Sequence, residues 1–517
     1  MRPLALLILV PLAGACAGPS IDDAAASPAA TLQGRQVADA GSITAEDMRA
    51  RIGFLADDAL RGRDTPSPGL EVAAAYIASE FMRLGLEPAG DDGGYLQRYP
   101  YVLRTSNPDA TMLAVAGAEG ETALRPGNDF YTTAGEPARV EGALVFTGTG
   151  IDATVGAALR DRIAVVHLTG TDGRSRAAAN QARSAAQAAG ARALLVVLDP
   201  AMGAEQISQR AGATTARAGP ARIPVAHVRY ETARTLLRSA DHDLDTLVQR
   251  AASADFSPVP LSGLTARLAT PFTDVRHEPP NVVAVLRGSD PALRDTYVVF
   301  SAHMDHVGVG RPDADGDSIF NGADDDASGT SAVLEVAEAF ASMPVPPARS
   351  LVFLTVSGEE KGLLGSAWYA DHPTVPIDRI VANINIDMIG RNAADSVVAI
   401  GQEFSSLGPL VQEVAGRNPE LGLTVSQDPW PEQRFFFRSD HFNFARKEIP
   451  AIFFFTGTHE DYHRPSDHVE KIDTDKAARI ARLVFLLGHA IATDADAPRW
   501  TEQGLNEVRA LTTGRND

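Results

Sequence analysis

Histidine and carboxylate side chains follow a series of apolar runs in the second half of the chain. The residues that follow the runs are His303, Asp305, His306, Glu359, Glu360, Asp387 and the group His459, Glu460, Asp461, Tyr462 and His463; a further acidic cluster, Asp324, Asp325 and Asp326, precedes a predicted helix. Imidazole and carboxylate ligands without thiolates suit zinc, with manganese or cobalt possible. Isolated carboxylates are too costly to gather inside a protein without compensation, and divalent cations are the usual compensation. The pattern therefore predicts a divalent metal site.

The number of candidate ligands predicts two metal ions rather than one. A catalytic zinc takes about three protein ligands and a water molecule. Two histidines and three carboxylates instead suit a pair of ions about 3.5–4 Å apart that share one bridging carboxylate. Such a pair activates water and polarises a carbonyl oxygen. A carboxylate that is not a ligand must take the proton from that water, and the adjacent Glu359 and Glu360 can divide these two roles.

The elements that must bring these residues together are predicted to form an α/β fold. Runs that are apolar throughout predict strands covered on both faces, so we expect a mostly parallel central sheet with helices on both sides. In such open sheets, ligands bind beyond the carboxyl ends of the strands. The predicted strands are 281–287, 296–302, 350–356, 379–386 and 450–455, and the predicted helices include 69–84, 328–342 and 473–493.

The stretch 135–255 has a different character, because short apolar runs alternate there with Ala-rich helical stretches. It predicts a small separate β/α module inserted into the larger domain. We therefore expect a first part of the catalytic domain at 42–134, an insert at 135–255, and the main part with the metal site at 256–517.

The amino terminus has the pattern of a secretory signal. Arg2 precedes an apolar run at 4–12, and small residues at 13–15 lead to Cys16, which is the single cysteine of the chain. The run is shorter than the roughly 20 residues that span a bilayer. The arrangement resembles a bacterial lipoprotein signal. We expect a signal peptide at 1–15, a lipidated Cys16 with a flexible tether over 16–41, and a periplasm-facing outer-membrane lipoprotein. An ordinary cleaved signal, giving a periplasmic or secreted protein, is the alternative.

Composition excludes several classes of protein. The chain has 517 residues, a formal charge of −20 and 44% hydrophobic residues, which are the values of a globular protein of several domains. An acidic balance argues against nucleic acid as a partner, because phosphate backbones require a basic face. Membrane attachment is expected only through Cys16, and a single cysteine excludes an intramolecular disulfide.

Five motifs together resemble those of secreted dizinc aminopeptidases, in the branch with an inserted protease-associated domain. This family is related to glutamate carboxypeptidase and the transferrin receptor. The resemblance covers about 42–130 and 256–495, and it is looser over the insert. The motifs are SAHMDHVG at 301–308, NGADDDASG at 321–329, SGEEKG at 357–362, NIDMIG at 385–390 and YHRPSD at 462–467.

The resemblance implies a ligand set for two Zn²⁺ ions per chain. His303, Asp325 and Asp387 would bind one zinc. Asp325, Glu360 and His463 would bind the other, so that Asp325 bridges the two ions. The peptide bond between Asp325 and the next residue is often cis in this family.

The resemblance also implies three catalytic roles. Glu359 would be the general base and later the acid that protonates the leaving amine. Asp305 would hydrogen-bond the far nitrogen of His303 and fix its tautomer. Tyr462 would donate a hydrogen bond to the tetrahedral oxyanion.

The expected activity is removal of amino-terminal residues from peptides with a free amino terminus. The first alternative is a carboxypeptidase of the glutamate-carboxypeptidase type, which needs cationic groups for a terminal carboxylate. That group typically has Arg where this chain has Met304, although Arg434 and Arg438 could serve. A single-zinc cyclase of amino-terminal glutamine and a non-catalytic receptor are the remaining alternatives, and both conflict with the complete ligand set. The oligomeric state is not predicted.

Overall fold

The structure is a computed structural model that describes residues 40–132, 137–151, 156–170, 173–211, 215–217, 222–253 and 255–513. The predicted signal peptide, Cys16 and nearly all of the predicted tether lie outside these residues. The chain divides into two compact units. Unit 1 comprises residues up to Leu96 and from Asn281 onward, and unit 2 comprises Gln97–Pro280. Within the described residues, no helix has the length and apolar character needed to cross a membrane.

Unit 1 is built on a mixed sheet whose centre is parallel. Strands β18, β15, β19 and β22 run parallel to one another, whereas β14 and β20 pair with them in the antiparallel sense. The α/β class is thereby confirmed. The order across the sheet is β1 (Glu87–Pro88), β14 (Pro280–Leu286), β18 (Ser350–Val356), β15 (Tyr297–His303), β19 (Ile380–Ile386), β22 (Ala451–Phe455), β20 (Ser396–Ile400) and β21 (Thr424–Ser426).

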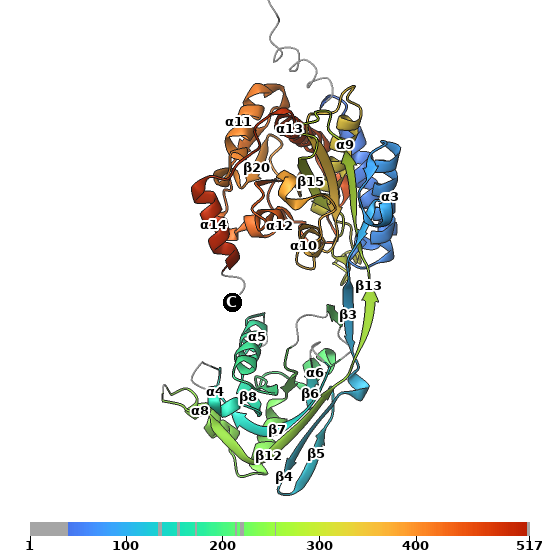
Figure 1. Cartoon of the computed structure of the whole chain (residues 1–517). Helices are drawn as coiled ribbons and strands as arrows, with labels where there is room; N and C mark the ends of the chain where they lie inside the picture. The colour runs from blue at the N-terminus through green and yellow to red at the C-terminus, as the bar shows by residue number, and fades with distance from the viewer. Residues whose placement is uncertain are drawn as a thin grey trace, which may run out of the picture. The chain divides into compact units, whose positions relative to one another are not determined.

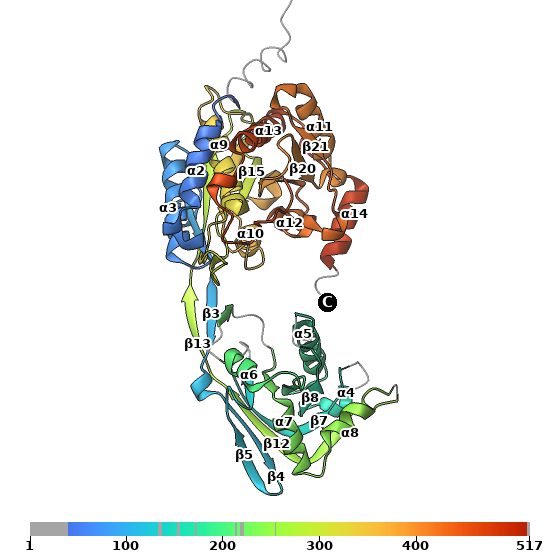
Figure 2. The ribbon, with the colours of Figure 1, turned by 180° about the vertical axis from the view of Figure 1, so that it is seen from behind.

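Helices cover both faces of this sheet (Figures 1 and 2). Alternation along β15 explains why, because Val298 and Phe300 enter one buried cluster while Val299 enters the cluster on the opposite face. The helices on the first face are α2 (Ala45–Leu55), α3 (Pro68–Arg83), α9 (Gly329–Ala341), α11 (Leu407–Arg417) and α13 (Thr474–Thr493), and those on the second are α10 (Leu364–Asp371) and α12 (His441–Ala445).

The ends of several elements follow from local chemistry. The Thr44 hydroxyl accepts a hydrogen bond from the Asp47 amide and begins α2, and Ser67 does the same for α3 ahead of Pro68. Asp473 caps α13 through the Lys476 amide. A further helix, α14 (Glu502–Thr513), follows the last helix that the sequence predicted.

Unit 2 contains the predicted insert but is wider than 135–255. Strands outside those limits pair with strands inside them, because β12 runs antiparallel to both β4 and β7. The sheet order is β5 (Gly120–Leu124), β4 (Met112–Gly117), β12 (Val259–Thr270), β7 (Ala138–Phe146), β8 (Ile163–His167), β9 (Ala193–Val197), β11 (Val225–Val228) and β6 (Phe130–Thr132).

The described residues of unit 2 also form a second sheet and five α-helices. Strand β3 pairs antiparallel with both of its neighbours in the second sheet. That sheet is β10 (Thr215–Arg217), β3 (Tyr101–Ser106) and β13 (Phe272–His277), and the helices are α4 (Gly156–Leu159), α5 (Gly173–Ala188), α6 (Ala204–Arg210), α7 (Tyr230–Arg238) and α8 (Leu244–Arg250).

A largely buried ion cluster joins three helices of unit 1. Arg51 on α2 lies 2.8 Å from Glu80 on α3, and 2.6 and 2.5 Å from Glu335 and Glu338 on α9. The Arg51 side chain is 9% exposed. Burial acts to lower its pKa, but the surrounding carboxylates outweigh burial and raise it. The cluster therefore fixes the helical layer on the first face of the sheet.

We expect Arg51→Ala to destabilise unit 1 by about 3–5 kcal/mol, because removing one partner leaves buried carboxylates without compensation. Urea denaturation followed by circular dichroism measures the change. Arg83→Ala is the matched control, since Arg83 contacts Glu80 and Glu338 from a half-exposed position and should cost only about 0–1 kcal/mol. Equal losses for the two variants would contradict the structural role of Arg51.

Candidate metal centre

Three parallel strands deliver the candidate ligands to one edge of the sheet. His303 is the last residue of β15 and stands in register with Val356, the last residue of β18. Glu359 and Glu360 follow β18 in the next turn, and Asp387 follows β19 directly. Carboxyl ends of parallel strands meet at the same edge, which is where open α/β sheets bind ligands.

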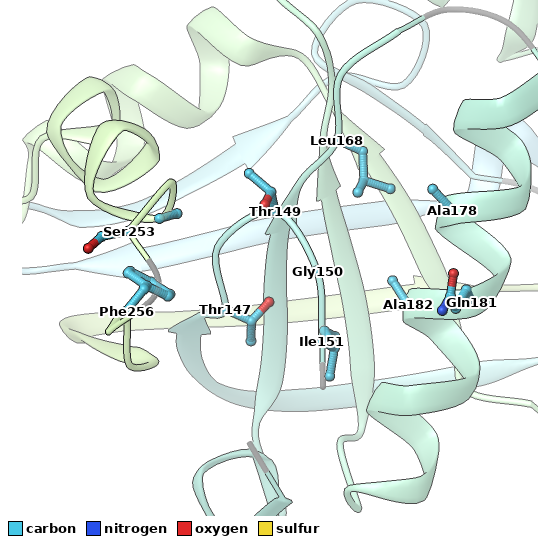
Figure 3. Close-up of a pocket in the computed structure, with 11 residues that line it drawn as sticks. Thr147, Thr149, Gly150, Ile151, Leu168, Ala178, Gln181, Ala182, Ser253 and Phe256 are labelled. Carbon is cyan, nitrogen blue, oxygen red and sulfur yellow. The ribbon is translucent and has the colours of Figure 1, made fainter. Parts of the chain in front are cut away.

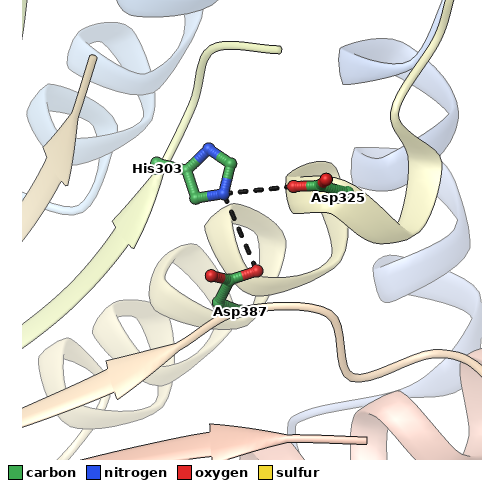
Figure 4. Close-up of side chains that lie close together, drawn as sticks. All are labelled: His303, Asp325 and Asp387. Atoms are coloured by element: carbon green, nitrogen blue, oxygen red, sulfur yellow. Dashed lines mark ion pairs between the residues drawn. The ribbon is translucent and has the colours of Figure 1, made fainter. Parts of the chain in front are cut away.

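The first ligand group consists of three buried side chains. His303 Nε2 lies 3.2 Å from Asp325 Oδ1 and 3.7 Å from Asp387 Oδ1, as Figure 4 shows. Ligand atoms about 2.0–2.1 Å from a tetrahedral zinc are separated from each other by about 3.3 Å. The three atoms therefore have the spacing that one ion requires, and the residues present fit a metal.

The second ligand group uses the other oxygen of the same aspartate. His463 Nε2 lies 3.1 Å from Asp325 Oδ2 and 3.3 Å from Glu360 Oε2. Asp325 thus presents Oδ1 to one group and Oδ2 to the other, which is the geometry of a carboxylate between two ions. The structure brings together all five residues of the predicted ligand set.

The electrostatics of the site show how the histidines and carboxylates depend on one another. Burial acts to lower the pKa of His303, but Asp387, Asp305 and Asp325 outweigh burial and raise it well above its usual value. Burial acts to raise the pKa of Asp325, yet the surrounding histidines hold it well below the usual value. Without these positive partners the buried carboxylates would be strongly unfavourable, so the site favours cations.

The three carboxylates at 324–326 have different partners: Asp325 faces the ligand groups, whereas Asp324 and Asp326 accept hydrogen bonds from main-chain amides. Asp326 accepts hydrogen bonds from the amides of His303, Gly329 and Met388 at 2.8–3.2 Å. Asp324 accepts from the Gly390 amide at 2.6 Å. The peptide bond between Asp325 and Asp326 is cis. Of the three carboxylates, Asp325 alone belongs to both ligand groups described above.

Asp305 lies against the far nitrogen of His303, with its carbonyl oxygen as the nearer group. His303 Nδ1 lies 3.1 Å from the main-chain oxygen of Asp305, whereas the carboxylate oxygen Oδ1 is 3.7 Å away. The carboxylate accepts instead from the Thr65 hydroxyl at 2.9 Å and from the Glu359 amide at 3.3 Å. Asp305 therefore orients His303 through its carbonyl and holds the turn that carries Glu359.

Glu359, Tyr462 and the ligands His303, Asp325 and Asp387 line one pocket, together with His463. The pKa of Glu359 is raised well above its usual value, mainly by burial and further by neighbouring carboxylates. Tyr462 stacks on the His463 ring, with ring centroids 3.9 Å apart. A proton acceptor and a phenol donor thus border the same space as the ligand groups.

The same pocket is also lined by apolar side chains and by one guanidinium. Met388, Phe435, Phe453 and Phe455 supply the apolar surface. Arg438 also lines the pocket, and its guanidinium carbon lies 4.7 Å from the centre of the Phe435 ring. The pocket can therefore contact a hydrophobic side chain next to the ligand groups.

Sequence reasoning missed a residue that supports the first ligand group. The Ser439 hydroxyl donates a hydrogen bond to Asp387 Oδ2 at 2.8 Å and accepts one from the side-chain amide of Asn385 at 2.8 Å. It thereby orients Asp387 so that Oδ1 faces His303. Its place in the consecutive Ser439-Asp440-His441 gives no local signal for this contact, which forms across 52 residues of sequence.

A second and larger cavity in unit 2 offers different chemistry (Figure 3). Its volume is about 380 Å³, and it lies beside the segments that follow β7 and β8. Thr147, Thr149, Gln181 and Ser253 supply its polar groups, with Phe256 among the apolar ones. The described residues that line it include no ionisable side chain, so the metal and acid–base chemistry belongs to the pocket in unit 1.

Residues 281–487 match the model of Peptidase family M28. The matched segment contains both ligand groups described above. The match does not extend over the predicted insert at 135–255, so the protease-associated character of the insert stays a prediction.

Proteins similar to this chain include some named as zinc metalloproteases and some named as aminopeptidases. A "Probable zinc metalloprotease" of Pyricularia oryzae is 27% identical over 260 residues, covering 41% of this chain and 49% of that protein. "Aminopeptidase YwaD" of Bacillus subtilis is 29% identical over 174 residues, covering 32% of this chain and 36% of that protein. The chain thus spans about half or less of these curated relatives' length.

A solved structure shares the fold of the chain. An aminopeptidase from Aneurinibacillus sp. strain AM-1 aligns with a TM-score of 0.55 and 20% identity, over 90% of this chain and 97% of that one. At this identity the likeness concerns the fold.

We expect Asp325→Ala to weaken the binding of both metal ions, because its two oxygens face different ligand groups. Metal content after dialysis, measured by inductively coupled plasma mass spectrometry, tests this. Asp313→Ala is the matched control, since Asp313 lies in an exposed turn away from the ligands. Retention of two tightly bound ions by the Asp325 variant would refute the shared role.

Proposed function

We propose that the protein is a dizinc aminopeptidase that hydrolyses the amino-terminal peptide bond of peptides. The observation that carries the proposal is that one carboxylate oxygen of Asp325 faces His303 and the other faces His463. This arrangement would hold two adjacent metal ions beside a pocket whose lining includes apolar side chains. Relatives named as zinc metalloproteases and aminopeptidases support the same reading.

The chain's own residues have distinct roles in the proposed reaction. Two zinc ions held by the two ligand groups would polarise the substrate carbonyl and lower the pKa of water. Glu359 lines the pocket beside these groups, accepts the proton of the attacking water and returns it to the leaving amine. Tyr462 donates a hydrogen bond from its phenol to the developing oxyanion. Ser439 and the Asp305 carbonyl keep Asp387 and His303 aimed at the first ion.

A carboxypeptidase is the second candidate function, and Arg438 is the observation that favours it. Arg438 lines the pocket and could pair with a terminal carboxylate. Met304 offers no help to such a substrate, because its side chain is fully buried and its sulfur lies 3.7 Å from the Thr355 hydroxyl. A receptor without catalysis is disfavoured by the complete set of ligands.

We expect Glu359→Gln to retain zinc and lose about 10²–10⁴-fold in turnover, because general acid–base catalysis contributes this much. The measurements are kcat on a peptide substrate and the zinc content of the same sample. Glu420→Gln is the control, since Glu420 is exposed in a short helical turn at Pro419–Leu421. A Glu359 variant that is as active as the parent would remove Glu359 from this role.

The activity itself is tested with free and N-acetylated versions of one short peptide panel, with and without chelator and zinc add-back. We expect chelator-sensitive release of the first residue from free peptides only, restored by zinc. Acetylation removes the amino-terminal charge that an aminopeptidase requires. Release from the carboxyl end, unaffected by acetylation, would establish the carboxypeptidase instead. Absence of cleavage with two zinc ions bound would reject both peptidases.

A further inference from the structure

A second imidazole approaches Glu360 from the side opposite His463. His306 is fully buried, and its Nδ1 lies 2.8 Å from Glu360 Oε1 and 3.7 Å from Asp325 Oδ2. His463 faces the other oxygen, Glu360 Oε2, at 3.3 Å. The two imidazole rings are 5.6 Å apart and inclined at 70°. Both therefore converge on the same pair of carboxylates.

The contacts of His306 are incomplete without a further group. Within the described residues, neither ring nitrogen of His306 makes a contact with hydrogen-bond geometry, and the same is true of Glu360 Oε1, although Nδ1 and Oε1 lie 2.8 Å apart. Buried polar atoms rarely stay unpaired, because burial removes their hydrogen bonds to water. A cation between the two would satisfy a nitrogen lone pair and a carboxylate oxygen at once.

The distances suit shared coordination. Two ligand atoms at about 2.0–2.1 Å from one zinc are separated by about 2.9 Å at a right angle and about 3.3 Å at a tetrahedral angle. The separation of 2.8 Å between His306 Nδ1 and Glu360 Oε1 lies near the lower value. His306, Asp325 and Glu360 together form a group whose ligand atoms lie within 4.8 Å of one another.

The backbone holds the His306 ring in this position. The main-chain amide of His306 donates to the Arg63 carbonyl at 3.3 Å. Gly322 packs against the ring with φ at +58°, and a Cβ atom there would come within 2.5 Å of the ring carbon. Only glycine combines this backbone conformation with so close an approach. The fold thus leaves room for the imidazole and keeps it pointed at Glu360.

We propose that His306 is a fourth protein ligand of the second metal position, alongside Asp325, Glu360 and His463. The inference rests on the proposed function only for the presence of zinc. It makes the two positions unequal, with three protein ligands at the first and four at the second. The first position therefore keeps more of its coordination open for substrate, and the second holds its ion more firmly.

The test counts imidazoles by X-ray absorption spectroscopy of the full-length protein loaded with two zinc ions. With His303, His463 and His306 as ligands, three imidazoles serve two ions, so the average is about 1.5 per zinc. Without His306 the average is about 1.0 per zinc. The parent protein alone decides between these values. The His306→Gln variant should lower the average from about 1.5 to about 1.0.

His489→Gln is the matched control, because His489 is also buried but packs against Phe340 and Phe485, away from the carboxylates. It should leave the average unchanged. An average of about 1.0 in the parent protein, or no change in the His306 variant, would overturn the proposal while leaving the dizinc site intact. A parent protein that takes up no zinc would overturn the proposed function together with this inference.

Discussion

The candidate metal centre of unit 1 depends on the contacts between the Asp325 carboxylate and two histidines. The carboxylate is buried, and it faces His303 through one oxygen and His463 through the other. Its amide and that of Asp324 donate to the carboxylate of Asp467, while Asp326 gathers amides from three different segments. The loop is thus fixed on both sides of Asp325, so the fold sets the distance between the histidines that its two oxygens face.

Concentrating negative charge in an interior has a physical cost that the site offsets in two ways. Main-chain amides and the Ser439 and Thr65 hydroxyls satisfy the carboxylate oxygens that face away from the metal positions. The oxygens that face those positions are opposed by imidazoles. Burial and repulsion from Asp325 both act to raise the pKa of Glu360. The contacts with His306 and His463 outweigh them, so the pKa of Glu360 falls to about 2. Such a site is arranged for cations before any ion binds.

Function follows from this site rather than from the architecture. The larger cavity of the protein lies in unit 2, yet its described lining has hydroxyl, amide and apolar groups without ionisable side chains. The smaller pocket in unit 1 combines ligands, a raised-pKa carboxyl group and apolar side chains. The side chains that line the two pockets, and not their volumes, indicate that the pocket in unit 1 is the candidate active site. Open α/β folds support many activities, and the groups at the strand ends decide among them.

Much of the framework could be predicted from local sequence. The apolar runs located β14, β15, β18, β19 and β22 within a residue or two, because burial on both faces leaves an uninterrupted apolar signal. The types of the candidate ligands were also legible, since only certain side chains bind zinc. The limits of unit 2 could not be predicted, because β4 and β12 are separated by more than 140 residues and their pairing is visible only in the folded structure.

The sequence alone determined which side chains could hold metal and the edge of the sheet that carries them. Tertiary structure decided that the two oxygens of Asp325 face different histidines, that Asp305 serves His303 through its carbonyl, and that His306 reaches Glu360. Those outcomes depend on distances of a few ångströms between segments far apart in the chain, which residue types and spacing do not encode.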